Sequence, residues 1–273
     1  MRKALKKITA GLLHIDVLCY IPDERGKKRR GGRQAPTSAA QRFYNAKCSW
    51  RECELDLAAN FGADAWFLTL TCDNAHLPSN KAGMRKYIQK MVRDLRKARA
   101  RRGEDFRYLY TIEGCHGKQI CAPFDADGEL EVRRLHIHMV VNRISADDLE
   151  EFKSLWPGGG YIRAERLDIH YYQELAKYLT KEAREFGRAK PGERTWVKSK
   201  NCKKYEVQYE DLPDGLTLAP PKGAVDYYSF STKNPYGFAD CVGARYLIFP
   251  QRERVEYSYN QPRKRQRSIH FSS

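Results

Sequence analysis

The sequence predicts an α+β domain in which helices cover an antiparallel sheet. Segments with helical apolar spacing alternate with short apolar, β-branched segments in the order β-α-β-β-α-β, and another helix follows. A chain of 273 residues can bury such a core without disulfide bonds. No apolar run approaches the roughly 20 residues that cross a bilayer. The sequence therefore predicts a globular protein with no membrane partner.

The first half of the pattern contains two helices and one strand. Apolar residues recur at helical spacing over 38–61, and the apolar, aromatic segment 65–72 (AWFLTLTC) predicts a buried strand. Ser79 is expected to cap a second helix that runs to about Arg101. The apolar side of that helix consists of Met84, Ile88, Met91 and Leu95.

The second half completes the split β-α-β pattern. Residues 106–113 and 131–142 predict two strands that pair antiparallel across a glycine-rich loop. A short helix is expected over 145–155, a strand over 161–167 and a last helix over 168–186. The six elements together predict one antiparallel sheet with helices packed on it.

The chain divides into a main domain with an extension at each end. Residues 22–37 are rich in glycine, proline and positive charge, so residues 1–37 are predicted to form a basic N-terminal extension. The main domain is expected over 38–186. Tyrosine-rich segments and a basic tail follow, and residues 187–273 are predicted to complete the domain or to contact DNA.

Charge and cysteine usage restrict the class of partner. The chain has 50 Lys and Arg against 34 Asp and Glu, a net charge of +16, which suits a polyanion, although a merely soluble basic protein has the same composition. Its eight cysteines are scattered and lack zinc-site spacing, which indicates reduced thiols in a cytosol. His14 and Asp16 interrupt the apolar stretch 8–21, so we expect no cleaved signal peptide.

A pair of histidines is the sharpest local feature. Residues two apart on a strand point to the same face, so His136 and His138 would project together from the strand 131–142. The preceding strand carries Glu113, which an antiparallel pairing can bring beside them. Two imidazoles and a carboxylate suit Mg²⁺ or Mn²⁺. The alternative is that Glu113 is an ordinary strand-end acid facing water.

The last predicted helix carries a tyrosine and a lysine on one face. Tyr178 and Lys181 lie three residues apart and are therefore neighbours on a helix. A phenol with a pKa near 10 is a poor nucleophile at neutral pH, so a metal-polarised phosphate and a nearby cation would both assist it. The alternative is that Tyr178 packs on the sheet while Lys181 is solvated.

Three ordered segments resemble the motifs of the HUH replication initiators. They are FLTLT on the first strand, RLHIHMVVN on a later strand and KYLTK on the following helix, and the likeness covers about residues 64–186. It is strongest to initiators of small single-stranded DNA phages and bacterial rolling-circle plasmids, and RTWVKSKN at 194–201 faintly echoes their segment after the helix. The resemblance implies a ferredoxin-like HUH endonuclease core over 38–186 in the cytoplasm of a bacterial host.

The resemblance also implies a chemistry. His136, His138 and Glu113 would bind Mg²⁺ or Mn²⁺, Tyr178 would form a 5′-phosphotyrosine, and Lys181 would position the phosphate or a metal-bound group. The protein would then start rolling-circle replication by nicking one DNA strand at an origin and later rejoining it. Alternatives are a single-tyrosine transposase of the same superfamily and a non-catalytic protein that binds single-stranded nucleic acid.

Some initiators of this family have two catalytic tyrosines four residues apart. The matching position here is Glu174, which favours a single nucleophile. Tyr171 lies seven residues before Tyr178 on nearly the same helical face and is a candidate second nucleophile, whereas Tyr172 points elsewhere. The histidine pair precedes the tyrosine, unlike the permuted order that relaxases resemble.

The remaining predictions concern DNA contacts and partners. The helix that follows Ser79 has a basic face that would contact phosphates, unless it is only a solvated surface. Its proposed DNA-binding residues are Arg85, Lys86, Lys90, Arg93 and Lys97, with Arg96, Arg99, Arg101 and Arg102 on the same helix. No GxxxxGK[ST] phosphate loop occurs, so unwinding is expected from a host helicase and synthesis from a host polymerase. Origin sequence and oligomeric state stay open.

Overall fold

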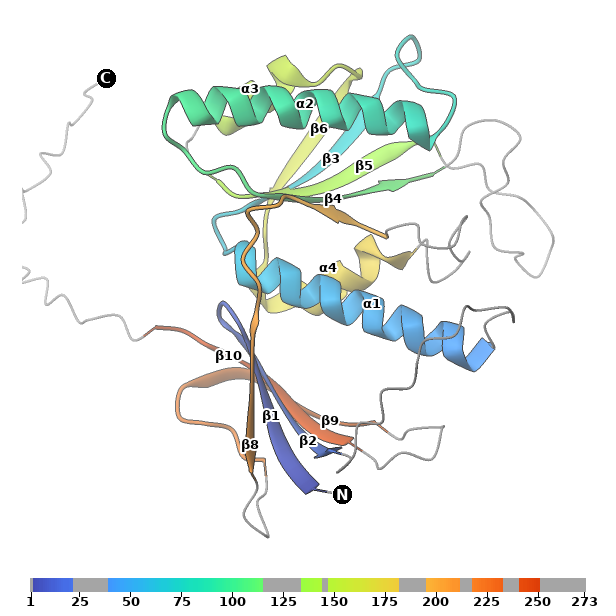
Figure 1. Cartoon of the computed structure of the whole chain (residues 1–273). Coiled ribbons are helices and arrows are strands. Elements are labelled where there is room, and N and C mark those ends of the chain that lie inside the picture. Colours follow the sequence, from blue (N-terminus) through green and yellow to red (C-terminus); the bar gives the residue numbers. More distant parts are fainter. Residues whose placement is uncertain are drawn as a thin grey trace, which may run out of the picture.

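A computed structural model of the chain describes residues 2–21, 39–114, 134–143, 147–181, 195–211, 218–232 and 241–250. Within these ranges it has two five-stranded antiparallel sheets and four α-helices, so the predicted α+β class is confirmed. Figure 1 shows the elements in layers, with a helical layer above an upper sheet and a second helical layer between that sheet and a lower one. None of the described helices is long and apolar enough to cross a membrane.

The upper sheet has the predicted split β-α-β order. Its strands are β3 (Trp66–Cys72), β4 (Tyr108–Glu113), β5 (His136–Val141), β6 (Gly159–Arg166) and β7 (Val197–Lys198), in the spatial order β6-β3-β5-β4-β7. The helices α2 (Lys81–Arg101) and α3 (Asp148–Leu155) follow β3 and β5 in the chain. Every strand pair in the sheet is antiparallel. The strand predicted over 131–142 begins outside the described residues, as does the helix predicted from Ser145.

One face of the upper sheet forms a core with α2 and α3. Leu135, Ile137 and Met139 alternate along the chain around β5 and are fully buried there. The predicted apolar side of α2 is also fully buried in this cluster, namely Met84, Ile88, Met91 and Leu95. Ser79 does not cap α2 as predicted, because Asn80 occupies the N-cap and its Oδ1 accepts a hydrogen bond from the Gly83 N–H at 2.9 Å.

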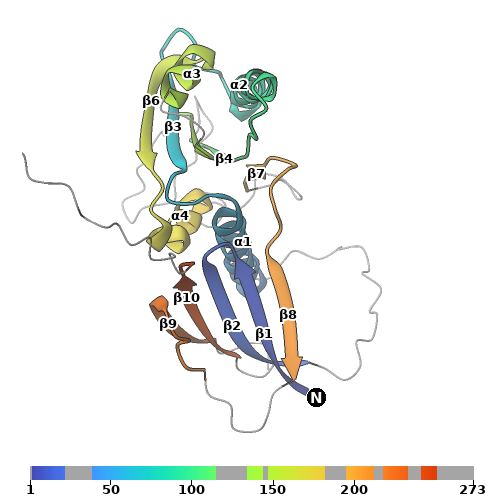
Figure 2. The ribbon, with the colours of Figure 1, turned by 90° about the vertical axis from the view of Figure 1, so that its left-hand side faces the viewer.

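The opposite face of the upper sheet rests on α1 (Ala39–Asn60) and α4 (Tyr172–Leu179) (Figure 2). Leu109 and Val140 of the sheet share a buried cluster with apolar residues of both helices. A single 3₁₀ turn, Ile169–Tyr171, precedes α4, so the helix predicted over 168–186 is shorter as described and its last residues fall outside the described ranges. α4 holds its place because the buried Tyr172 hydroxyl donates to the backbone oxygen of Phe61.

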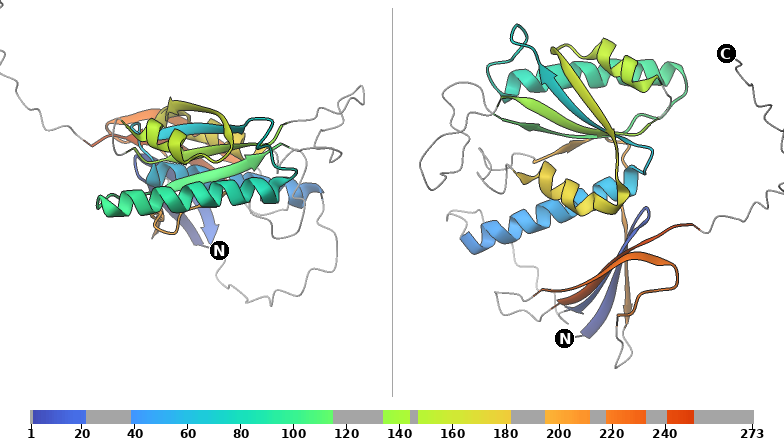
Figure 3. Two further views of the ribbon diagram at one scale, coloured as in Figure 1. Left: turned by 90° about the horizontal axis from the view of Figure 1, so that it is seen from above. Right: turned by 180° about the vertical axis from the view of Figure 1, so that it is seen from behind.

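The lower sheet packs against the far side of α1. Its strands are β1 (Arg2–Ala10), β2 (Leu13–Ile21), β8 (Glu206–Asp211), β9 (Ala224–Thr232) and β10 (Cys241–Ile248), in the order β8-β1-β2-β10-β9. At the tip of the β1–β2 hairpin Gly11 has a φ of +58°, and a Cβ there would lie 2.3 Å from the Ala58 oxygen. The hairpin therefore presses directly on α1, and Figure 3 shows the same stacking from behind.

The lower sheet joins the two ends of the chain. Sequence analysis did not predict β1 and β2, which lie in the proposed N-terminal extension 1–37. Within 187–273, β7 adds to the edge of the upper sheet, while β8, β9 and β10 belong to the lower one. The proposed domain bounds stay predictions. The basic segment 22–37 and the basic tail near the C-terminus lie outside the described residues.

Candidate active site

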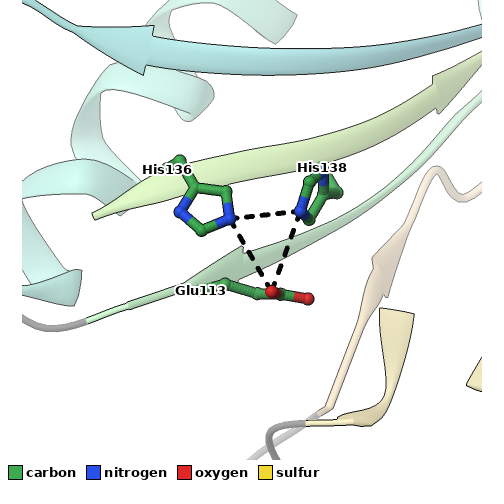
Figure 4. A group of neighbouring side chains, drawn as sticks. All are labelled: Glu113, His136 and His138. Carbon is green, nitrogen blue, oxygen red and sulfur yellow. Dashed lines mark hydrogen bonds and ion pairs between the residues drawn. The ribbon is translucent and has the colours of Figure 1, made fainter. Parts of the chain in front are cut away.

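The pairing of β4 with β5 brings a carboxylate and two imidazoles together. Glu113 lies opposite His136 in the antiparallel register, as predicted, and His138 shares the same face of β5. The Nε2 atoms of the two histidines are 3.1 Å apart, and Glu113 Oε2 is 3.7 Å from each of them. Figure 4 shows the three side chains converging on one point below the strands. Glu113 is therefore not a strand-end acid facing water, since it is only 3 % exposed.

Neighbouring groups fix the tautomers of both histidines. The Nδ1 atom of His136 is 2.9 Å from the backbone oxygen of Arg134, which can only accept, so Nδ1 carries the proton and Nε2 keeps its lone pair. The Nδ1 atom of His138 is 3.1 Å from the Thr69 hydroxyl, which can accept its proton in the same way. Both Nε2 lone pairs then point into the space beside Glu113.

The environment of His138 disfavours its protonation. Its ring is buried and stacks on Phe67 at 5.5 Å between centroids. Burial, followed by repulsion from His136 and Lys181, lowers the pKa of His138 to about 3. A neutral imidazole is the form that binds metals, so this nitrogen stays available as a ligand at neutral pH.

The three ligand atoms fit a small divalent cation. Two lone pairs that face one another at 3.1 Å repel unless a cation lies between them. Neighbouring ligands of an octahedral ion with bonds of about 2.1 Å lie about 3 Å apart, close to the spacing of the two nitrogens. Two histidines and one carboxylate on one side of an ion also leave positions open for a substrate. Among the described residues, this is the group of histidine, cysteine and acidic side chains that could hold a metal.

Tyr178 and Lys181 reach the same point from α4 and the turn after it. The Tyr178 hydroxyl lies 2.9 Å from His138 Nε2, and its side chain is 40 % exposed, so the phenol is reachable from solvent. The Lys181 Nζ atom lies 2.9 Å from Glu113 Oε2 and 3.7 Å from the centroid of the Tyr178 ring. Sequence analysis placed these two residues on one helical face, and the fold directs that face at the triad.

Lys181 keeps its charge in this setting. Burial acts to lower its pKa, but the hydrogen bond and the charge of Glu113, with a smaller contribution from Tyr178, outweigh burial and raise it. The ammonium therefore places a positive charge beside both the phenol and the carboxylate. A cation there stabilises a phenolate and also attracts a phosphate.

The structure separates the other candidate tyrosines from this point. Tyr171 is 58 % exposed, and no hydrogen bond or ring contact joins it to the triad within the described ranges. Tyr172 is buried against Phe61, and burial raises its pKa above the ordinary value. Tyr178 is therefore the tyrosine whose hydroxyl meets the triad, and a role for Tyr171 stays a prediction.

The basic residues of α2 lie across the sheet from the triad. The five proposed DNA contacts are all exposed, namely Arg85, Lys86, Lys90, Arg93 and Lys97. α2 covers the face of the upper sheet that carries Ile137, whereas the triad lies on the α1 and α4 face. Their contact with DNA stays a prediction, and it concerns a surface separate from the triad. Arg99 cannot share that role, because it is fully buried and its Nη2 lies 3.1 Å from Asp148 Oδ1.

Sequence analysis missed the residues that support the triad. Thr69 and Phe67 alternate on β3 and contact His138 from the neighbouring strand. Their signal was present in FLTLT, because a β3–β5 pairing puts every second residue of that segment on the histidine face. What the sequence lacked was the order of the strands, since β3 is a neighbour of β5 and not of β4.

Comparison with known protein families agrees with this geometry. Residues 65–183 match the family model of the replication-associated protein ORF2. That segment belongs to this family. The match spans the upper sheet from β3 to β6 and includes Glu113, His136, His138, Tyr178 and Lys181. No curated protein and no solved structure matches the chain. The family match confirms the predicted likeness to replication initiators.

Proposed function

We propose that this replication-associated protein is a rolling-circle initiator that nicks one DNA strand in a metal-dependent reaction. The observation that supports the proposal most directly is the 2.9 Å contact between the Tyr178 hydroxyl and His138 Nε2, within a triad suited to a divalent cation. A nucleophile, a candidate metal centre and a cation thus meet at one point. That combination is what phosphoryl transfer from DNA to an enzyme requires.

Glu113, His136 and His138 would hold Mg²⁺ or Mn²⁺. Such an ion, when bound, polarises a phosphate oxygen and stabilises the charge that develops on it. Thr69 and the Arg134 backbone oxygen orient the two imidazoles, so their ring planes stay fixed during the reaction. Lys181 supplies the second positive charge, which favours the phenolate of Tyr178 over the phenol.

The proposed reaction exchanges one phosphate ester for another. The Tyr178 oxygen attacks the scissile phosphorus, a tyrosine–phosphate bond forms, and the bond from phosphorus to the 3′ oxygen breaks. The phenol proton is lost to solvent, and the departing 3′ oxygen takes up a proton from water. The products are a free 3′-hydroxyl, which a host polymerase can extend, and a 5′-phosphotyrosine. The ester energy is retained, so the reverse attack can rejoin the strand without ATP.

The proposal leaves separation of the strands to a host helicase. The DNA origin would come from a single-stranded DNA phage or a bacterial plasmid, as the resemblance implies. A single-tyrosine transposase would use the same chemistry but would join two different DNA ends. Transfer of a cut strand to a second, unrelated strand would therefore favour the transposase.

The decisive experiment looks for the covalent adduct. The full chain is incubated with a library of single-stranded DNA, labelled at its 3′ end, and Mn²⁺, and adducts that survive denaturation are counted on a gel. The variants are Tyr178→Phe and His136→Ala, with Tyr171→Phe as the matched control. We expect an adduct with wild type and Tyr171→Phe, and none with the other two variants or with EDTA.

Each other outcome points to a different conclusion. An adduct that survives in Tyr178→Phe but not in Tyr171→Phe moves the nucleophile to Tyr171. The absence of an adduct with every library and with both metals overturns the nickase proposal. The protein would then be a non-catalytic single-strand binder, which metal-independent binding would identify.

A further inference from the structure

An exposed tyrosine lies beside the triad on the upper sheet. Tyr161 of β6 is 73 % exposed, more than the other large hydrophobic residues that the structure describes. No hydrogen bond or ring contact of its side chain is present within the described ranges. Its ring therefore packs on nothing in the described part of the protein, and its exposure has no explanation in the fold.

The strand register places Tyr161 on the same face as the histidines. Ile162 pairs with Leu70 and is buried beneath α2 and α3, so Tyr161, one residue earlier, points to the opposite face. The Thr71 hydroxyl donates to the Tyr161 backbone oxygen at 2.8 Å, and Thr71 pairs with His136. Tyr161, Thr71, His136 and Glu113 therefore form one row across four neighbouring strands.

The distance along this row suits a polynucleotide. Neighbouring strands lie about 4.8 Å apart, so the β6 backbone at Tyr161 is roughly 10 Å from that of His136. The next residue on the same face, Arg163, pairs with Thr69 in the row of His138, and its side chain is exposed beside Glu165. An aromatic ring and a guanidinium thus follow one another along β6, as base and phosphate alternate in a single strand.

Two glycines keep the approach to Tyr161 open. A Cβ on Gly160 would lie 2.5 Å from the Thr71 backbone oxygen, so β6 can begin this close to β3 only without a side chain there. Gly159 has a φ of +65° and would place a Cβ 2.3 Å from Asp73 Oδ2. The edge of the sheet before Tyr161 therefore carries backbone alone.

We infer that Tyr161 stacks on a base of a single-stranded nucleic acid whose phosphate lies at the triad, an inference that rests on the proposed function for the place of that phosphate. Stacking needs only the π-face of a base, so the contact tolerates any sequence. Tyr161 is a positioning residue: it holds the strand on β6 while the phosphate stays within reach of Tyr178.

The test measures binding without cleavage. Full-length Tyr178→Phe in EDTA is the parent, and fluorescence anisotropy follows a labelled thymidine oligonucleotide at several salt concentrations. Adding Tyr161→Ala should weaken binding about tenfold, or about 1.4 kcal/mol. Tyr161→Phe, which keeps the ring, should stay within about twofold. Tyr209→Ala is the matched control, because Tyr209 is 50 % exposed on the edge strand β8 of the lower sheet, and it should change nothing.

Two further measurements separate stacking from charge and from misfolding. Tyr161→Ala should leave the slope of log affinity against log salt unchanged, because that slope counts phosphate contacts. On an abasic oligonucleotide of the same length, parent and Tyr161→Ala should bind equally. Tyr161→Trp should bind like the parent and add indole fluorescence that the thymidine oligonucleotide quenches.

Equal binding of the thymidine oligonucleotide by parent and Tyr161→Ala would overturn the inference, as would an equal loss in Tyr209→Ala or on the abasic strand. The outcome is independent of the chemistry. If wild type forms no adduct but Tyr161→Ala loses affinity, the nickase proposal fails and the stacking surface stands. If the adduct forms and Tyr161→Ala binds as the parent does, only the stacking surface fails.

Discussion

Lys181 Nζ lies 2.9 Å from Glu113 Oε2, so in the protein without metal an ammonium neutralises the carboxylate of the triad. The Glu113 side chain is almost fully buried, and that of Lys181 is mostly so. A buried carboxylate needs such a cation, because water cannot solvate it. A divalent ion in the triad would supply the same charge from the other side and would leave Lys181 more free to interact with Tyr178 or a phosphate.

The variant Lys181→Ala should therefore be unstable without metal and recover with it. We expect its free energy of unfolding in EDTA to fall by about 1–3 kcal/mol, because the Glu113 carboxylate loses its cation. Mn²⁺ should stabilise this variant more than it stabilises wild type. Urea denaturation with EDTA and with Mn²⁺ measures both, and Lys204→Ala, an exposed lysine, is the control. Equal stability of Lys181→Ala and wild type in EDTA would show that the ion pair contributes nothing.

The hydroxyl of Thr69 should matter for metal binding although it does not touch the ion. It lies 3.1 Å from His138 Nδ1 and orients the ring. Removing such a supporting contact typically costs about 10-fold to 100-fold in metal affinity. Titration calorimetry with Mn²⁺ should therefore give weaker binding for Thr69→Val. Thr71→Val is the matched control, because the Thr71 hydroxyl bonds to the backbone of Tyr161 instead. Similar losses in both variants would refute the orienting role.

The stability of the metal-free protein should depend on pH through His138. Burial, then repulsion from His136 and Lys181, lowers the pKa of the folded imidazole to about 3, whereas the unfolded value is about 6.5. Between these values the unfolded chain binds a proton that the folded chain does not. Stability is therefore complete above about pH 6.5 and decreases as the pH falls toward 3, by at most about 1.4 kcal/mol per pH unit.

The variant His138→Gln isolates this contribution, because it removes the titrating group. Urea denaturation in EDTA at about pH 7 and about pH 5 should show a larger loss of stability in wild type than in the variant. His136→Gln is the comparison on the more exposed histidine of the pair. An identical loss in wild type and His138→Gln would mean that His138 is not held neutral by its surroundings.

The sequence predicted the active site better than the fold around it. Alternation along a strand was enough to put His136 and His138 on one face, and antiparallel pairing was enough to bring Glu113 to them. Helical spacing likewise put Tyr178 and Lys181 together. These relationships are local, or depend on one strand pair, and short-range periodicity captures them.

The lower sheet could not be predicted in the same way. Its strands come from both ends of the chain, and β1 pairs with β2 and with β8, about 200 residues away in sequence. No local pattern encodes such a pairing. Lys6 and Lys7 also made β1 resemble a basic extension, although Ile8 beside them packs in the core with α1. Arg99 misled in a similar way, because its type suggests a surface and its neighbours Asp148 and Glu151 permit burial.

Tyr172 and Tyr178 should differ in what their hydroxyls do. The Tyr172 hydroxyl donates to the Phe61 oxygen in the core, so Tyr172→Phe should lower the free energy of unfolding by about 1–2 kcal/mol and keep the covalent adduct with DNA. Tyr178→Phe should abolish the adduct with little loss of stability, because Tyr178 is partly exposed. Denaturation and the adduct assay on both variants check this. Loss of the adduct in a folded Tyr172→Phe variant would contradict the assignment.

Arg99 should stabilise the fold without contributing to DNA affinity. Its guanidinium bonds to Asp148 and to the Asn142 backbone oxygen at 3.1 Å each, and it lies over the ring of Phe106. Arg99→Ala leaves the Asp148 carboxylate in the core without its cation and should cost about 3–5 kcal/mol. The double variant Arg99→Met, Asp148→Leu should recover much of that loss, because neither charge then remains buried.

The double variant also tests the DNA role directly, because it is expected to fold. A phosphate contact contributes about one unit to the slope of log affinity against log salt. We expect Arg99→Met, Asp148→Leu to keep the wild-type slope with single-stranded DNA. Lys90→Ala, on the exposed face of α2, is the comparison, and a smaller slope there would support the predicted basic contact surface. A smaller slope in the Arg99 double variant would instead place this buried arginine at the DNA, which its position between α2 and α3 does not allow in the described fold.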